Sequence, residues 1–157
     1  SVPGVYAVGD VNGGPQFTYI SLDDFRIVFG ALTGNGHYTL KDRKNIPYTT
    51  FLTPPLARVG LTEEDAINKG YTVKTKEMLV ATMPRAHVND NLKGAFKIVV
   101  DAESNLILGA TLYSQSAEEL INMIKVAMDN NIPYTYFKNQ IFTHPTMAEN
   151  LNDLCNF

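Results

Sequence analysis

The chain has 157 residues, of which 45% are hydrophobic and 18% charged, so it is long enough for an ordinary domain with a buried core. The net charge of −3 and the scattered Lys and Arg residues argue against nucleic acid or an anionic membrane as the main partner, and no apolar run is long enough to span a bilayer. Cys155 is the only cysteine, which excludes an internal disulfide and a cysteine metal cluster. We therefore expect no metal site and a reducing, cytoplasmic location.

The chain opens with a short apolar run. Residues 5–8 (Val-Tyr-Ala-Val) predict a strand that ends at Gly9 and Asp10. A strand so early, with no initiator methionine before it, suggests a fragment of a longer protein. The carboxyl end of a strand is where an open α/β sheet places ligand contacts, so Asp10 is a candidate binding residue. The alternative is that residues 9–14 form only an Asp-led turn.

A helix is predicted over residues 18–32 from apolar residues at helical spacing. Its start near Thr18 can present backbone N–H groups to an electronegative ligand atom. Together with the preceding strand and Gly-rich turn, this helix resembles part of a mononucleotide-binding unit. Residues 33–36 end the helix, and the polar, turn-rich segment 37–48 predicts a linker or domain boundary.

From about residue 46 the pattern changes to strands joined by turns, with helices between and after them. This pattern is typical of an α+β fold with an antiparallel sheet, here of about four to five strands with helices packed on it. Thr62 and the acidic residues 63–65 predict a short helix that closes at Gly70. The expected strands cover residues 56–61, 71–83, 95–101 and 106–113, and residues 84–90 are expected to form a loop. A capping box at Ser116 and Glu119 predicts the start of a helix that runs to about Asn130.

A histidine, a proline, a hydroxyl residue and a carboxylate lie close together in residues 142–149. Thr146 and Glu149 have the spacing of a capping box, and an apolar helical stripe follows them. We therefore expect His144 at a helix start, with Glu149 about one turn further on. A carboxylate there can fix the imidazole tautomer and raise the basicity of the other ring nitrogen, as a general acid/base pair requires. The alternative is a capping box beside a loop histidine.

Several motifs, taken in order, resemble those of the pyridine nucleotide–disulfide oxidoreductases. Residues 5–10 are similar to that family's second flavin-binding signature, and residues 144–149 (His-Pro-Thr-Met-Ala-Glu) to its carboxy-terminal active-site motif. Residues 13–25 are most similar to the reactive-chlorine-resistance branch, a relative of the mercuric reductases. The matches to the family's interface domain are residues 57–63, 85–86, 94–97, 108–110 and 117–121.

The resemblance implies a homodimeric flavoprotein that uses FAD together with NADH or NADPH. Asp10 matches the carboxylate that hydrogen-bonds the flavin ribityl chain, with Gly9 allowing close backbone approach. Thr18 falls at the helix start that faces the flavin pyrimidine edge. His144 matches the acid/base residue that serves the redox dithiol of the other subunit, and Glu149 matches its orienting partner. In the family, the peptide bond between this histidine and the following proline is cis.

The resemblance divides the chain into the end of an FAD-binding domain, residues 1–45, and an interface (dimerisation) domain, residues 46–157, of an enzyme of redox homeostasis. The family's amino-terminal FAD motif, nicotinamide domain and redox Cys pair are not among these residues, so the chain alone is expected to be inactive and to bind no FAD. Pro55 and Ser21 depart from the family pattern, and the lone Cys155 is expected to be a packed or frayed thiol at the chain end.

Two functions remain open at this point. In the first, the chain belongs to an NAD(P)H oxidoreductase and supplies the His-Glu acid/base pair across the dimer. In the second, it is a purely structural dimerisation module of a flavoprotein that reduces a metal ion or quinone without this pair. The final electron acceptor, whether a disulfide, a metal ion or another small molecule, is left open.

Overall fold

The computed structural model describes residues 2–157, which divide into two compact units. The first unit ends at Lys44, and the second comprises Asn45–Phe157. The division falls within the polar, turn-rich segment 37–48. Among the described residues, no helix is both long enough and apolar enough to cross a membrane.

The N-terminal unit contains a short 3-10 helix, η1 (Gly9–Asn12), and a long helix, α1 (Thr18–Thr33). The predicted helix is confirmed, and it ends where Gly34 adopts a left-handed φ of 78°. The predicted strand over residues 5–8 is wrong: this segment is irregular, and Val5 is 70% exposed. A strand must pair its N–H and C=O groups with a neighbour, and the described residues of this unit contain no other strand.

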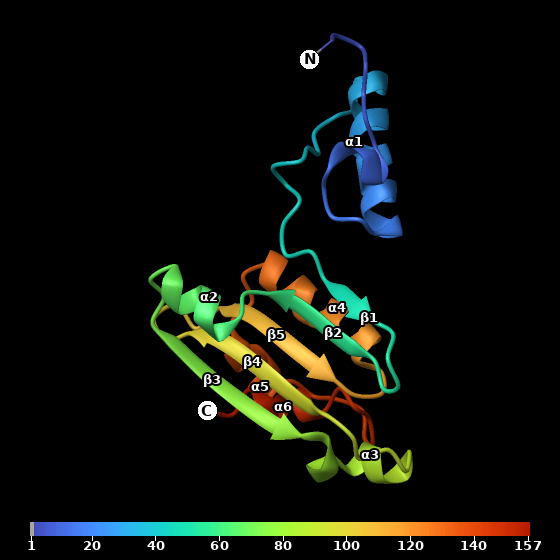
Figure 1. Cartoon of the computed structure of the whole chain (residues 1–157). Helices are drawn as coiled ribbons and strands as arrows, with labels where there is room; N and C mark the ends of the chain where they lie inside the picture. Colours follow the sequence, from blue (N-terminus) through green and yellow to red (C-terminus); the bar gives the residue numbers. More distant parts are fainter. Residues whose placement is uncertain (1) are drawn as a thin grey trace. The chain divides into compact units, whose positions relative to one another are not determined.

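The second unit is built on a five-stranded antiparallel sheet in the order β1-β2-β5-β4-β3 (Figure 1). The predicted α+β class and strand number are confirmed. Ala57 and Phe96 lie on either side of Leu112 in the register, and all three side chains are completely buried on one face. The strands are β1 (Tyr48–Thr50), β2 (Leu56–Gly60), β3 (Val73–Leu79), β4 (Ala95–Asp101) and β5 (Ile107–Tyr113).

Helices α4, α5 and α6 cover the buried face of this sheet (Figure 1). Helix α4 packs on β2 and β5, and α6 packs on β3 and β4 as well as on α5. The predicted apolar stripe of α4 is confirmed, because Leu120, Ile121 and Ile124 all lie in the core. The bounds are α4 (Ala117–Asp129), α5 (Tyr134–Asn139) and α6 (Asn150–Leu154).

The capping box predicted at the start of α4 is wrong. Ser116 adopts a left-handed conformation, with φ of 66°, and its side chain makes no capping hydrogen bond. A capping serine normally has an extended backbone, which directs its hydroxyl toward the N–H groups of the first turn. The chain reaches α4 only a few residues after β5 ends at Tyr113, and this short connection uses a left-handed turn instead.

The capping box at the start of α2 (Glu63–Asn68) is formed, by Thr62 and Asp65. Strand β3 is shorter than predicted, because the 3-10 helix η2 (Val80–Thr82) follows it directly.

The segment predicted as a loop contains helix α3 (Pro84–Val88). Pro84 occupies the first helical position, where its missing N–H group costs nothing, and Ala86 anchors the turn in the core. His87 therefore lies on a helix, exposed, with its Nε2 2.8 Å from the Ala81 carbonyl.

Candidate functional site

The imidazole of His144 and the carboxylate of Glu149 meet directly, with 2.7 Å between His144 Nδ1 and Glu149 Oε2. Because an ionised carboxylate only accepts hydrogen bonds, Nδ1 carries the proton in this pair. The His144 side chain is 69% exposed, whereas that of Glu149 is 18% exposed. The other ring nitrogen, Nε2, is therefore the one that can exchange a proton with an outside group. The His144–Pro145 peptide bond is cis, as the family resemblance implies.

The predicted capping box between Thr146 and Glu149 is confirmed. The Thr146 N–H donates to Glu149 Oε1 at 3.0 Å, and the Glu149 N–H donates to Thr146 Oγ1 at 3.2 Å. Regular helix α6 begins only at Asn150, so the prediction that His144 lies at a helix start is wrong: residues 144–149 form bends and turns that lead into the helix. The two carboxylate oxygens are thus divided between two tasks: Oε1 binds the backbone, and Oε2 binds the imidazole.

These contacts keep Glu149 ionised. Burial by itself raises the pKa of Glu149, but the hydrogen bonds from the His144 ring and the Thr146 N–H lower it by more, so its pKa lies below the ordinary value. An ionised Glu149 can both fix the imidazole tautomer and stabilise a positive charge on the ring. The pair has the geometry that general acid/base chemistry requires.

Two asparagines, which the sequence pattern did not single out, stabilise the backbone around this pair through hydrogen bonds from their side-chain amides. Asn150 is 2% exposed, and its amide donates to the Thr146 and Met147 carbonyls. The Asn152 amide reaches back to the end of α5 and donates to the Phe137 carbonyl at 2.7 Å. Asparagine is common in turns and helix caps, so neither residue type nor spacing marked these two as supports.

The predicted flavin contacts all lie in the N-terminal unit. Gly9 begins η1 with a positive φ of 74°, and Asp10 follows it with an exposed side chain. Thr18 is the first residue of α1 and is also exposed. The Gly9 N–H donates to Asp24, a buried residue of α1 that the sequence analysis did not single out. An exposed carboxylate and a helix N-terminus are groups that can bind a polar ligand.

Of the two states expected for Cys155, packed or frayed, the structure shows the packed one. Its side chain is completely buried in the core that α6 forms with the sheet. Burial raises the pKa of Cys155 to about 12, against an opposing effect of Lys76. Since the thiolate is the reactive form, we expect Cys155 to be unreactive in the folded protein at neutral pH. Across residues 2–157, no three His, Cys, Asp or Glu side chains are grouped to hold a metal ion.

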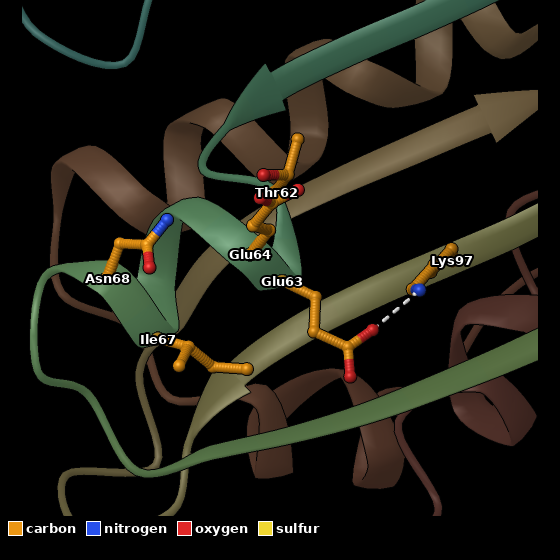
Figure 2. Close-up of a pocket in the computed structure, with 6 residues that line it drawn as sticks. All are labelled: Thr62, Glu63, Glu64, Ile67, Asn68 and Lys97. Atoms are coloured by element: carbon orange, nitrogen blue, oxygen red, sulfur yellow. Dashed lines mark hydrogen bonds and ion pairs between the residues drawn. The ribbon is translucent and has the colours of Figure 1, made fainter.

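Figure 2 shows a shallow, open pocket beside α2, which the sequence analysis did not predict. Lys97 reaches into it from β4 and pairs with Glu63 at 2.7 Å, although both side chains are about 40% exposed. The described residues that line the pocket include no histidine and no cysteine. The lining therefore lacks a histidine–carboxylate pair like that of His144 and Glu149.

Residues 46–155 match the family described as the pyridine nucleotide-disulphide oxidoreductase dimerisation domain. The match includes both His144 and Glu149 and most of the chain. This chain therefore belongs to the pyridine nucleotide-disulphide oxidoreductases, and it contains their dimerisation domain.

Individual relatives agree with this assignment. The probable pyridine nucleotide-disulfide oxidoreductase RclA of Escherichia coli K12 is 49% identical over 150 residues, which are 96% of this chain and 34% of RclA. A mercuric reductase of Lysinibacillus sphaericus is 37% identical over 147 residues, which are 94% of this chain and 27% of that protein. The solved structure of the HOCl-induced flavoprotein disulfide reductase RclA from E. coli matches with a TM-score of 0.92 at 49% identity, over 96% of this chain and 34% of that one. The chain thus spans about a third or less of the length of these relatives, and the predicted family and branch are confirmed.

Proposed function

We propose that this chain forms the end of the FAD domain (residues 1–45) and the dimerisation domain (residues 46–157) of an FAD-dependent NAD(P)H oxidoreductase. In this proposal His144 and Glu149 are the acid/base pair that each subunit supplies across a homodimer. The observation that carries the proposal is the 2.7 Å contact between an exposed imidazole and a largely buried carboxylate. A capping box alone requires the carboxylate but not the histidine.

His144 would take the proton of a substrate or enzyme thiol at Nε2 and leave the thiolate that attacks a disulfide sulfur, from which the other sulfur leaves as a thiolate. Glu149 would hold Nδ1 protonated throughout and stabilise the imidazolium while the ring carries the extra proton. The same ring would return the proton when the thiol re-forms. The thiol served is not Cys155, because that side chain is enclosed in the core.

The N-terminal unit would contribute to the flavin site. Asp10 would accept a hydrogen bond from a ribityl hydroxyl, and Gly9 would let the backbone approach the cofactor closely. Thr18 would present the N-terminus of α1, where the helix dipole favours an electronegative atom, to the pyrimidine edge. FAD, when bound, supplies the relay that accepts a hydride from NADH or NADPH and passes two electrons on.

A homodimer in the cytoplasm is the proposed working state. The matched domain is a dimerisation domain, and Phe51 and Ile141 in it are 80% and 92% exposed. Large apolar side chains of this kind are typical of the buried centre of a homodimer contact. The proposed acceptor is a disulfide. A metal ion is the second candidate, because a mercuric reductase is among the relatives.

The test is stopped-flow kinetics of the full-length protein that contains this chain. His144→Gln should slow electron transfer to a disulfide acceptor by about 10²–10⁴-fold, the usual contribution of a general acid/base. Reduction of the flavin by NADH or NADPH should be unchanged, because no thiol proton moves in that step. His37→Gln, at an exposed position of the N-terminal unit, is the matched control.

Slower flavin reduction with normal electron transfer to the acceptor would show that the role given to His144 is wrong. If neither half-reaction changes, the alternative function holds: the enzyme reduces a metal ion or quinone without this pair, and the dimerisation domain is structural.

A further inference from the structure

A buried carboxylate lies beneath the short helix that carries Asp10. Asp24, in the second turn of α1, is 4% exposed. Its Oδ2 atom accepts hydrogen bonds from the Gly9 N–H and from the Asn12 side-chain amide, each at 2.7 Å. Its Oδ1 atom accepts a hydrogen bond from the guanidinium of Arg43. Asp24 therefore forms hydrogen bonds with the chain on both sides of Asp10, at Gly9 and at Asn12.

The carboxylate of Asp24 is charged although it is buried. The hydrogen bond from Arg43 is the main reason that its pKa lies below the ordinary value, and the Gly9 and Asn12 bonds add to this effect against the opposing effect of burial. A buried charge is tolerated only when its hydrogen-bonding capacity is met. Since Gly9 and Asn12 provide part of that capacity, moving their segment away from α1 would leave a buried charge incompletely satisfied.

Two further features fix the conformation of residues 9–14. Asn12 Oδ1 accepts a hydrogen bond from the Gly14 N–H at 2.8 Å, which closes the turn after η1. A Cβ atom placed on Gly9 would come within 3.0 Å of Ser21 Oγ, so the backbone of η1 lies close against α1. Residues 9–14 are thus tied to the same helix that begins at Thr18, while the Asp10 side chain remains exposed.

We propose that Asp24 is a positioning residue for the flavin site, which sets the place of the Asp10 carboxylate through its bonds to Gly9 and Asn12. Arg43 neutralises Asp24 and lies in the segment that precedes the second unit. This inference rests on the proposed function, in which Asp10 binds the ribityl chain. Asp24 itself contacts neither cofactor nor substrate.

The experiment uses the full-length protein that contains this chain, stripped of FAD and titrated with FAD while flavin fluorescence is followed. In Asp24→Asn, the new NH₂ group must face either Arg43, which loses one hydrogen bond, or the Gly9 and Asn12 donors, which loses two. We expect the Kd for FAD to rise about 10- to 100-fold, the value of a hydrogen bond to a charged group.

The neighbouring Asp23→Asn variant is the matched control. Asp23 accepts a hydrogen bond from Arg43 Nε at 2.6 Å but makes no bond to residues 9–14. The Asp23→Asn variant should leave the Kd for FAD within about threefold of wild type, which is a smaller effect than the loss of one ordinary hydrogen bond would cause. Equal Kd values for the Asp23 and Asp24 variants would overturn the inference.

The Asp10→Ala background separates positioning from general damage. If Asp24 acts through Asp10, Asp24→Asn should add little once the Asp10 carboxylate is gone. An equal loss in both backgrounds means that Asp24 is merely structural and the inference is wrong. If Asp10→Ala alone leaves the Kd for FAD unchanged, the flavin contact in the proposed function is wrong instead, and the inference falls with it.

Asn12→Ala keeps the test decisive if Asp24→Asn does not fold. Asn12 is exposed, and its removal leaves the Asp24–Arg43 pair intact. It should raise the Kd for FAD several-fold, and this effect should also disappear in the Asp10→Ala background. An unchanged Kd for this variant would overturn the role given to the contact between Asn12 and Asp24.

Discussion

The side-chain amide of Asn152 donates to the backbone carbonyl of Gln140 at 2.9 Å, so a residue of α6 holds the point where the chain leaves α5. From Gln140 the chain runs past His144 to Thr146, whose N–H is held by Glu149. Both ends of the segment 140–146 are therefore fixed by residues 149–152. The exposed His144 ring is thus positioned by the ends of its segment and by Glu149, since burial contributes little.

Replacing Asn152 by Ala should release the first of these ends. The change removes donors to carbonyls that have partial access to water, so we expect a loss of about 1–2 kcal/mol in the free energy of unfolding. Amide hydrogen exchange should accelerate in residues 140–146 more than in the strands. The control is Asn130→Ala, because the Asn130 amide bonds only to the Val126 carbonyl of its own helix. Equal exchange in the two variants would contradict this role for Asn152.

The pH dependence of stability should carry a contribution from Glu149. Its pKa is lowered in the folded protein, where hydrogen bonds from His144 and Thr146 outweigh the effect of burial. Such a group stabilises the fold above its unfolded pKa, and this stabilisation disappears as the pH falls through the folded pKa. Glu149→Gln should therefore reduce the free energy of unfolding near about pH 7, and the difference from wild type should shrink below about pH 4.

Urea unfolding over this pH range measures the effect. Glu77→Gln, at an exposed position on β3, is the control and should show a smaller, flatter difference from wild type. A Glu149→Gln difference that stays constant down to about pH 3 would mean that the carboxylate charge does not stabilise the fold.

The thiol of Cys155 should resist modification in the folded chain. Burial raises its pKa to about 12 and also blocks access to it. We expect no reaction with an aromatic disulfide reagent at neutral pH until urea unfolds the chain. Asn156→Cys places a second thiol at the neighbouring exposed position and should react at once, with one equivalent. Rapid labelling of wild-type chain without denaturant would show that α6 opens in the native state.

The chain should dimerise through its second unit. If His144 serves the other subunit, the nearby Ile141 side chain, which is 92% exposed, should lie at the subunit contact. Sedimentation at about 10 µM, a concentration chosen from typical affinities, should show a dimer. Ile141→Asp should weaken it by about tenfold or more, as burial of a charge in an apolar contact does. Ile67→Asp, at a 54% exposed position on α2, is the control. A wild-type monomer would contradict the prediction.

The capping boxes predicted at Ser116 and at Thr146 show what a local sequence pattern can and cannot predict. Thr146 and Glu149 form the predicted pair of hydrogen bonds, whereas Ser116 and Glu119 share the same spacing but do not. The difference lies in the backbone before the helix, which is left-handed at Ser116. That conformation results from the short path between β5 and α4, which is a property of the packed sheet and helix.

The sequence by itself determined the elements whose pattern is local: the apolar stripe of α4, strands β2 to β5 of the antiparallel sheet, and the pairing of His144 with Glu149 one turn away. Strand β1, which has only three residues, was not predicted. Only the tertiary structure decided what depends on distant partners. Residues 5–8 have strand composition but lack a neighbouring strand, so their hydrogen bonds cannot form a ladder. Asp24 and Asn152 look like ordinary polar helix residues, and their importance appears only when folding brings Gly9, Arg43 and Gln140 to them. Burial and long-range hydrogen bonds arise from packing, which composition and spacing do not encode residue by residue.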